Sequence, residues 1–176
     1  MRRVTIPGAG EEAHGVKRAA IICGCWLGLA LAASGCADRE PPFDVQTQIR
    51  LLEGADEEGR WAALTTLRDA GAAGGPAVDV LRTMLRGTRD EVLQSEIARA
   101  VAGIGGAAAP AVPDLIPLLA SSDAWVRTTA AQALGSIGVA AVPALPKLAP
   151  LAKDPDPDAA EAAREAVRRI RRAQKR

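Results

Sequence analysis

The chain has 176 residues, with 22 basic and 21 acidic side chains, and its formal net charge of +1 excludes a generally basic nucleic-acid-binding protein. It has no tyrosine and a single phenylalanine, Phe43, but much alanine, so it lacks the large side chains that a single globular core of this length would need. Two classes remain for such a composition, a stack of short helical repeats or a disordered chain rich in Ala, Gly and Pro.

The first 36 residues have the order of charge and hydropathy of an export signal. Arg2, Arg3, Lys17 and Arg18 form a basic segment, and residues 19–33 follow it without a charge. At about 1.5 Å per residue this uncharged stretch spans roughly 22 Å, which is less than the hydrocarbon core of roughly 30 Å. It therefore fits the hydrophobic region of a signal peptide over residues 1–35 better than a stable membrane span.

The uncharged stretch ends in the sequence L-A-A-S-G-C, with small residues at Ala33, Ser34 and Gly35 before Cys36. This ending resembles a bacterial lipobox, although that family usually has leucine at the position of Ala33. The resemblance implies export, transfer of diacylglyceryl to the Cys36 thiol, cleavage between Gly35 and Cys36, and acylation of the new N-terminus. The alternative is ordinary signal-peptidase cleavage, which would leave Cys36 as a free thiol.

Cysteine usage favours lipidation, because Cys23 and Cys25 would leave with the signal and Cys36 would be the only thiol left. Several acyl chains hold a protein stably on a membrane, since each buried CH₂ contributes about 0.8 kcal/mol. Ala37 rather than aspartate follows the cysteine, and the sorting pattern of enterobacterial lipoproteins then favours the outer membrane, with Asp38 weakening this assignment. We expect this lipid and no other cofactor.

The segment 36–44 would be the lipidated N-terminus and a tether, because A-D-R-E-P-P-F-D is charged and carries two prolines. Loss of residues 1–35 removes four basic and two acidic side chains and leaves 18 and 19. The mature chain would thus carry a net charge near −1, and we expect no nucleic-acid partner.

Positions that recur every 33 or 34 residues predict a helical repeat array over residues 45–170. Each unit begins at an aspartate suited to cap a helix, turns at a glycine that needs a left-handed conformation, and opens a second helix with a proline. These residues are Asp56, Asp90, Asp123 and Asp156, then Gly71, Gly105 and Gly138, then Pro76, Pro110 and Pro143.

Apolar residues at helical spacing keep the same register through the repeats. In the first helices they are Leu67, Val101, Leu134 and Val167, and in the second helices Leu81, Leu115 and Leu148. Residues 45–53 look like the second helix of a truncated unit, and 156–170 like a first helix alone. The prediction is an all-α fold, a short α-solenoid of three full helix pairs with a half-unit at each end.

The pattern D-x-x-V-R-x-x-A-A-x-A-L-G-x-I-G followed by A-V-P-A-L, at residues 123–145, resembles HEAT repeats, and most closely the HEAT-like repeats named after the phycobilisome (PBS) lyases. Other copies depart from it, since Gln94 replaces the arginine found at Arg60 and Arg127, and Asp69 and Ala70 replace serine and isoleucine. The resemblance implies a fold and leaves the function open.

The sequence carries no recognisable catalytic or metal site. His14 is the only histidine and would leave with the signal, so the mature chain would lack histidine, tyrosine and a free thiol. The repeated aspartates are expected to cap helices and to pair with Arg60 and Arg127 as a ladder between repeats. The glycine pairs G-S-I-G and G-I-G-G follow helices and lack the lysine of a phosphate-binding loop. We therefore predict no enzyme and no metal partner.

Five residues are candidates for binding a protein: Trp61, Trp125, Pro117, Pro150 and Lys153. Tryptophan is enriched at binding hot spots, although each could instead fill a gap between repeats. Pro117 and Pro150 should distort the second helices and share one helix face with Lys153. By the HEAT resemblance the second helices line the concave side, which is the default binding surface.

The last residues, 171–176, form a basic tail that continues a cluster of arginines beginning at Arg164. Cations suit a helix C-terminus through the macrodipole. The alternative role is contact with an anionic membrane surface or an acidic partner.

These observations predict a lipoprotein of the bacterial cell envelope that acts as a non-catalytic scaffold or adaptor for an unknown protein partner. One alternative is a phycobilin-lyase-like enzyme or chromophore-binding protein. The other is a regulator that keeps its N-terminal segment as a membrane anchor.

Overall fold

The computed structural model describes residues 43–54 and 56–176, and the regular elements there are all helical. The α-helices are α1 (Val45–Glu53), α2 (Glu57–Ala70), α3 (Val78–Gly87), α4 (Glu91–Ile104), α5 (Val112–Leu115), α6 (Ala124–Ile137), α7 (Leu145–Leu151) and α8 (Pro157–Ala173). The 3₁₀ segments are η1 (Gly71–Ala77), η2 (Gly105–Ala111), η3 (Pro117–Ala120) and η4 (Gly138–Ala144). The all-α prediction is confirmed. The predicted signal peptide, Cys36 and most of the tether lie outside the described residues.

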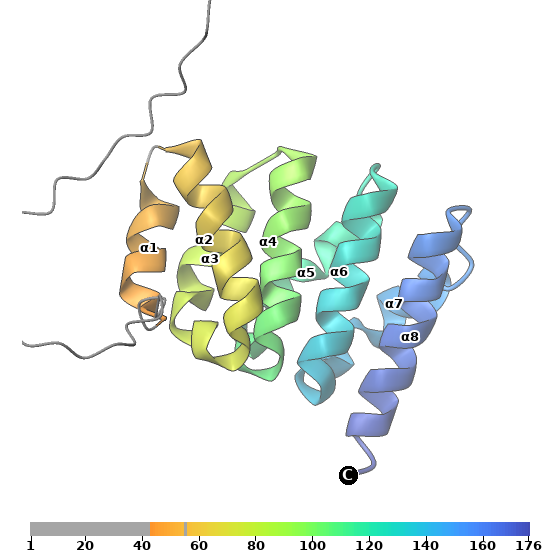
Figure 1. Ribbon diagram of the computed structural model, residues 1–176. Helices are drawn as coiled ribbons and strands as arrows, with labels where there is room; N and C mark the ends of the chain where they lie inside the picture. Colours follow the sequence, from red (N-terminus) through yellow and green to blue (C-terminus); the bar gives the residue numbers. More distant parts are fainter. Residues whose placement is uncertain (1–42, 55) are drawn as a thin grey trace, which may run out of the picture. The chain divides into compact units, whose positions relative to one another are not determined.

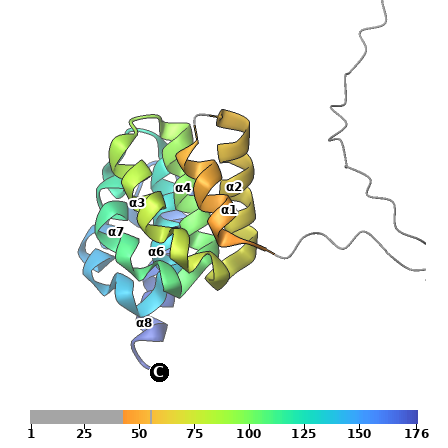
Figure 2. The ribbon, with the colours of Figure 1, turned by 90° about the vertical axis from the view of Figure 1, so that its left-hand side faces the viewer.

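The helices form two layers (Figures 1 and 2). In the first layer α2, α4, α6 and α8 lie side by side, and in the second layer α1, α3, α5 and α7 follow the same order. Each second-layer helix packs against the first-layer helix that comes next in the sequence, α1 on α2 and α7 on α8 among them. Each predicted half-unit is therefore paired with its neighbour, α1 with α2 and α8 with α7. Counted in this way, the array consists of four helix pairs.

The repeated aspartates begin the first-layer helices, as predicted. Each accepts a hydrogen bond from a backbone N–H in the first turn, at 3.1 Å from Gly59 to Asp56, 2.9 Å from Val92 to Asp90, 2.8 Å from Val126 to Asp123 and 2.9 Å from Ala159 to Asp156. Such a cap contributes about 1 kcal/mol to helix stability. Asp44 caps α1 in the same way, a role that the repeat pattern did not reveal.

The turn glycines have positive φ, but their conformation differs from the left-handed helical one that the sequence suggested. Gly71, Gly105 and Gly138 have φ of 59°, 67° and 78° with ψ of −136°, −134° and −127°. This combination is that of the first central residue of a type II′ turn, which glycine dominates. The turn leads into a 3₁₀ segment of seven residues, rather than directly into the second helix.

The repeated prolines do not open the second helices, so that prediction was wrong in detail. Pro76, Pro110 and Pro143 lie inside η1, η2 and η4, and the following α-helices begin two residues later, at Val78, Val112 and Leu145. The cause is the 3₁₀ connection itself, whose backbone accepts the fixed φ of proline near −65°.

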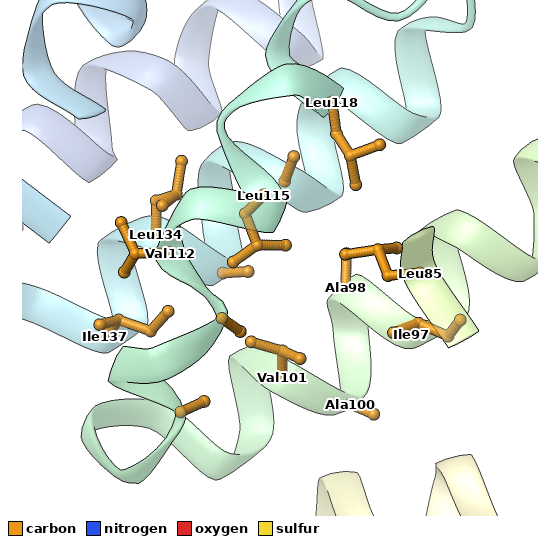
Figure 3. Close-up of a cluster of buried hydrophobic side chains, with 14 of the residues drawn as sticks. Leu85, Ile97, Ala98, Ala100, Val101, Val112, Leu115, Leu118, Leu134 and Ile137 are labelled. Carbon is orange, nitrogen blue, oxygen red and sulfur yellow. The ribbon is translucent and has the colours of Figure 1, made fainter. Parts of the chain in front are cut away.

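Leucine, isoleucine, valine and alanine fill the space between the layers (Figure 3). Side chains from α4, α5 and α6 meet there, with Val101, Leu115 and Leu134 almost fully buried. The first-layer helices come especially close at two glycines. A Cβ atom on Gly103 would lie 2.2 Å from the Arg68 carbonyl oxygen, and one on Gly135 would lie 2.9 Å from the Ala166 Cα.

One stretch of the described residues, Ala124–Leu151, is long and apolar enough to cross a membrane, with a mean hydropathy of 1.4. It is not one helix, however, because α6 ends at Ile137 and α7 begins only at Leu145. Its apolar character belongs to the repeat core, where Val126, Leu134 and Leu148 are buried.

Proline shortens α5 and α7, the second-layer helices nearer the C-terminus of the chain. In α3 the helix runs for 10 residues, whereas α5 has 4 and gives way to the 3₁₀ segment η3, which Pro117 begins. Pro113 and Pro146 lie in the first turns of α5 and α7, where no N–H is needed. Pro150 lies inside α7, which ends one residue later. The predicted distortion by Pro117 is thus seen directly.

Candidate protein-binding groove

A groove of about 610 Å³ lies on the second layer, between the α5–η3 segment and α7. It is called the second-layer groove below. Its lining residues are Ile116, Pro117, Leu119, Ala120, Lys147, Pro150, Leu151, Lys153, Asp154 and Pro155. The structure therefore brings together three of the five predicted binding residues, Pro117, Pro150 and Lys153.

At the preceding interface, between α3 and α5, the corresponding surface carries a cluster of ion pairs. Asp114 of α5 accepts hydrogen bonds from Arg82 Nε at 2.8 Å and from Arg86 Nε at 2.6 Å. The Asp114 side chain is only 10% exposed. Burial raises the pKa of Asp114, but the hydrogen bonds from Arg86 and Arg82 outweigh it and keep the pKa below its ordinary value. The carboxylate thus links two repeats.

The residues at the equivalent positions of the next interface cannot form this cluster. One repeat later, Lys147 stands where Asp114 does, while Ile116 and Ala120 stand where Arg82 and Arg86 do. Lys147 therefore has no acidic counterpart at these two positions with which to form ion pairs like those that link α3 to α5. The second-layer groove therefore lies where the pattern of charges changes between repeats. The sequence contained this signal, but it becomes visible only when all positions of the second helices are aligned.

The charge of the groove is positive. Lys147 and Lys153 are exposed, and neither forms an ion pair with another residue that the structure describes. The one carboxylate of the lining, Asp154, is bound by Arg127, with Nε and Nη2 at 2.9 Å and 2.8 Å from its two oxygens. Hydrogen bonds from Arg127 and from the backbone N–H of Asp156 lower the pKa of Asp154 and outweigh its burial.

A family model described as HEAT repeats matches residues 78–168, which is more than half of the chain. The chain belongs to the HEAT repeat family. The match begins with α3 and ends within α8, so it includes both sides of the second-layer groove. Among curated proteins, none matches the chain.

Several solved structures with the same fold are engineered proteins. The HEAT array is similar to one engineered protein with 28% identity and a TM-score of 0.62, over 73% of this chain and 63% of the other. It is similar to a second with 28% identity and a TM-score of 0.60, over 72% of this chain and 37% of the other. The chain thus spans less than two thirds of either protein.

A designed armadillo repeat protein, solved in complex with the peptide (KR)4, is 18% identical to this chain. Its TM-score is 0.59, and the likeness covers 74% of this chain and 70% of the other. At this level of identity the likeness concerns the fold alone. It agrees with the α-solenoid of helix pairs that the sequence predicts.

The two candidate tryptophans of the HEAT array lie on the first layer, away from the second-layer groove. Trp125, in the first turn of α6, is 51% exposed and lines a separate hollow between α6 and α8. Trp61, on α2, packs against the core, and its Nε1 donates a hydrogen bond to Glu57 Oε1 at 3.2 Å. Trp125 is therefore free to touch a partner, whereas Trp61 is half-buried in the array.

Two of the three carboxylates that line the hollow beside Trp125, those of Glu161 and Glu165, already have partners. Glu161 accepts from Arg164 and Arg168, and Glu165 accepts from Arg169 and Arg168. These hydrogen bonds lower the pKa of both glutamates. The arginines that the sequence assigned to a basic C-terminal cluster are thus partly neutralised along α8, which continues to Ala173, three residues into the predicted tail.

The predicted ladder of arginines and repeated aspartates is corrected by the structure. Arg60 Nη2 donates to the Gly54 carbonyl at 3.2 Å, and Arg127 Nη1 donates to the Ser121 carbonyl at 3.0 Å. Each acceptor lies two residues before the capping aspartate of the same helix. The side chains at this position therefore hold the loop between repeats, and only Arg127 adds an ion pair, with Asp154.

Gln94 explains why the arginine is not required in every repeat. Its Nε2 donates to the Thr88 carbonyl at 3.1 Å, which is the equivalent loop contact. An amide donor is sufficient to hold the loop, and the departure from the repeat pattern is thus structurally neutral. Within the described residues no group of His, Cys, Asp or Glu could hold a metal ion.

Proposed function

We propose that this HEAT repeat protein is a non-catalytic scaffold of the bacterial cell envelope, which binds another protein through the second-layer groove and is anchored by lipid on Cys36. The groove is the observation that carries the proposal. It is open and largely apolar, and it is walled by the prolines that do not recur in every repeat. Stacked helical repeats use such extended surfaces for binding.

The anchor is supported by the sequence of the leader, which ends a few residues before the array. Between Cys36 and the first residue of α1, Val45, there are eight residues, 37–44. Eight extended residues reach at most about 28 Å. A lipidated Cys36 would therefore keep the array close to the membrane surface, where it would bind a second envelope protein. We expect the outer membrane, on its periplasmic face.

The anchor is tested by the mass of the N-terminal peptide of the protein purified from bacterial membranes. We expect a peptide that begins at Cys36 and carries the mass of a diacylglyceryl group and an N-linked acyl chain. In a Cys36→Ser variant the lipid should be absent, and the protein should no longer be processed at Gly35. A native chain that retains Met1, or that carries an unmodified Cys36, would contradict the anchor.

The binding surface is tested by crosslinking in intact envelopes with a photoreactive phenylalanine analogue at single positions. Ala120 and Lys153 lie in the second-layer groove, and Val92, 62% exposed on the first layer, is the matched control. We expect both groove positions to yield the same crosslinked protein and Val92 to yield none. An analogue at Trp125 gives the competing outcome, because crosslinks from that position alone would move the binding surface to the first layer.

A further inference from the structure

We propose that the second-layer groove recognises an acidic, extended segment of the partner, in which carboxylates alternate with apolar side chains. This inference rests on the proposed function and names the chemistry of the partner. The carboxylates would lie against Lys147 and Lys153, and the apolar side chains would enter between η3 and α7.

The floor of the groove is suited to apolar side chains. Leu119 and Leu151 are 6% and 8% exposed and are already part of the core, and Ile116 is half-buried beside them. Pro117 and Pro150 form stiff walls that lose little conformational freedom when a ligand binds. A peptide with small or branched apolar residues can therefore fill the groove without rearranging the repeats.

Two exposed lysines, Lys147 and Lys153, belong to the lining of the groove. Lys147, Pro150 and Lys153 follow one another at a spacing of three residues, so the two lysines flank the proline. Within the described residues both ammonium groups lack a carboxylate partner, because Asp154 is bound by Arg127. An acidic side chain of the partner would pair with these ammonium groups without breaking an existing ion pair.

The neighbouring interface shows what kind of group completes this surface. Between α3 and α5 the array supplies its own carboxylate, Asp114, and two arginines hold it. Between α5 and α7 the two arginines are replaced by Ile116 and Ala120. The lining carries Lys147 and Lys153 instead, and the array supplies no carboxylate for these lysines. A partner that brings a carboxylate and an apolar side chain would therefore complete the second interface as Asp114 completes the first.

A nucleic acid fits the same lysines less well. Base stacking in single-stranded binding sites requires aromatic side chains, and the lining of the groove contains none. The lining is dominated by leucine, isoleucine, proline and alanine, which favours a peptide over a phosphate backbone.

The inference is tested with a phage library of random peptides selected on the full-length protein in detergent. We expect the selected peptides to be about twofold enriched in Asp and Glu over the unselected library, with Leu, Ile or Val between the acids. On a K147E/K153E variant the selection should turn towards Lys and Arg. Peptides from the wild-type selection should bind that variant about tenfold or more weakly.

A matched control is R171E/K175E, which changes the net charge by the same amount at exposed positions of α8 and the end of the chain. It should select the same acidic peptides as the wild type. No enrichment of acids, or the same peptides on K147E/K153E, would overturn the inference. If the envelope crosslinks from Ala120 and Lys153 persist in that case, the scaffold function stands and only the acidic chemistry of the partner is wrong.

Discussion

Replacing Gly103 by alanine should lower the free energy of unfolding by about 3 kcal/mol, near the upper end of the usual range for overpacked sites. The added Cβ would lie 2.2 Å from the carbonyl oxygen of Arg68, 2.7 Å from its Cα and 2.8 Å from its carbonyl carbon. All three are backbone atoms, so no rotamer change can make room, and α2 and α4 must move apart. Alanine gains about 1 kcal/mol in helix propensity, which offsets only part of this cost.

The measurement is urea unfolding followed by circular dichroism, with Gly87→Ala as the matched control. Gly87 is the last residue of α3, and a Cβ atom there meets nothing within 4 Å. The same substitution should therefore leave stability unchanged or raise it slightly. If Gly103→Ala were as stable as the wild type, the close approach of α2 and α4 would not contribute to holding the repeats together.

The recurring features of the array could be predicted because each solves a local problem that every repeat shares. An aspartate such as Asp123 caps each first-layer helix, and a glycine such as Gly138 is favoured where φ is positive. The error at Pro143 has a physical cause too. A proline fits the first turn of an α-helix and a 3₁₀ segment equally well, so the residue alone does not distinguish them.

The candidate site was predictable only in part, because it arises from a difference between repeats. Pro117, Pro150 and Lys153 were found from their position on one helix face. The role of Lys147 was missed, because it depends on which residue of the neighbouring repeat faces it across the interface. The two tryptophans looked alike in the sequence, but Trp61 packs against the core and Trp125 is exposed.

Replacing Arg127 by alanine should lower the free energy of unfolding by about 2 kcal/mol, because the partly buried Asp154 carboxylate and two loop carbonyls would lose their hydrogen-bond donor. The Arg127 side chain is 14% exposed, and it donates to Ser121, Ser122 and Asp154. Arg127→Gln should cost less, because Gln94 shows that an amide at this position still holds the loop. Arg169→Ala is the control, since that side chain is 55% exposed and its ion pair with Glu165 should contribute little.

The free energy of unfolding at low pH distinguishes the contribution of the Arg127–Asp154 ion pair from that of the contact between Arg127 and the loop carbonyls. The folded-state pKa of Asp154 is lowered, mainly by its hydrogen bond from Arg127. Its stabilisation is therefore complete above the unfolded-state pKa, about 3.9, and is lost as the pH falls through the lower folded-state pKa. The difference in unfolding free energy between the wild type and Arg127→Gln should accordingly be constant at neutral pH and shrink below about pH 4. A difference that stays constant down to the acid transition would mean that Arg127 acts through the loop carbonyls alone, and that Asp154 adds nothing to the contact between the last two repeats.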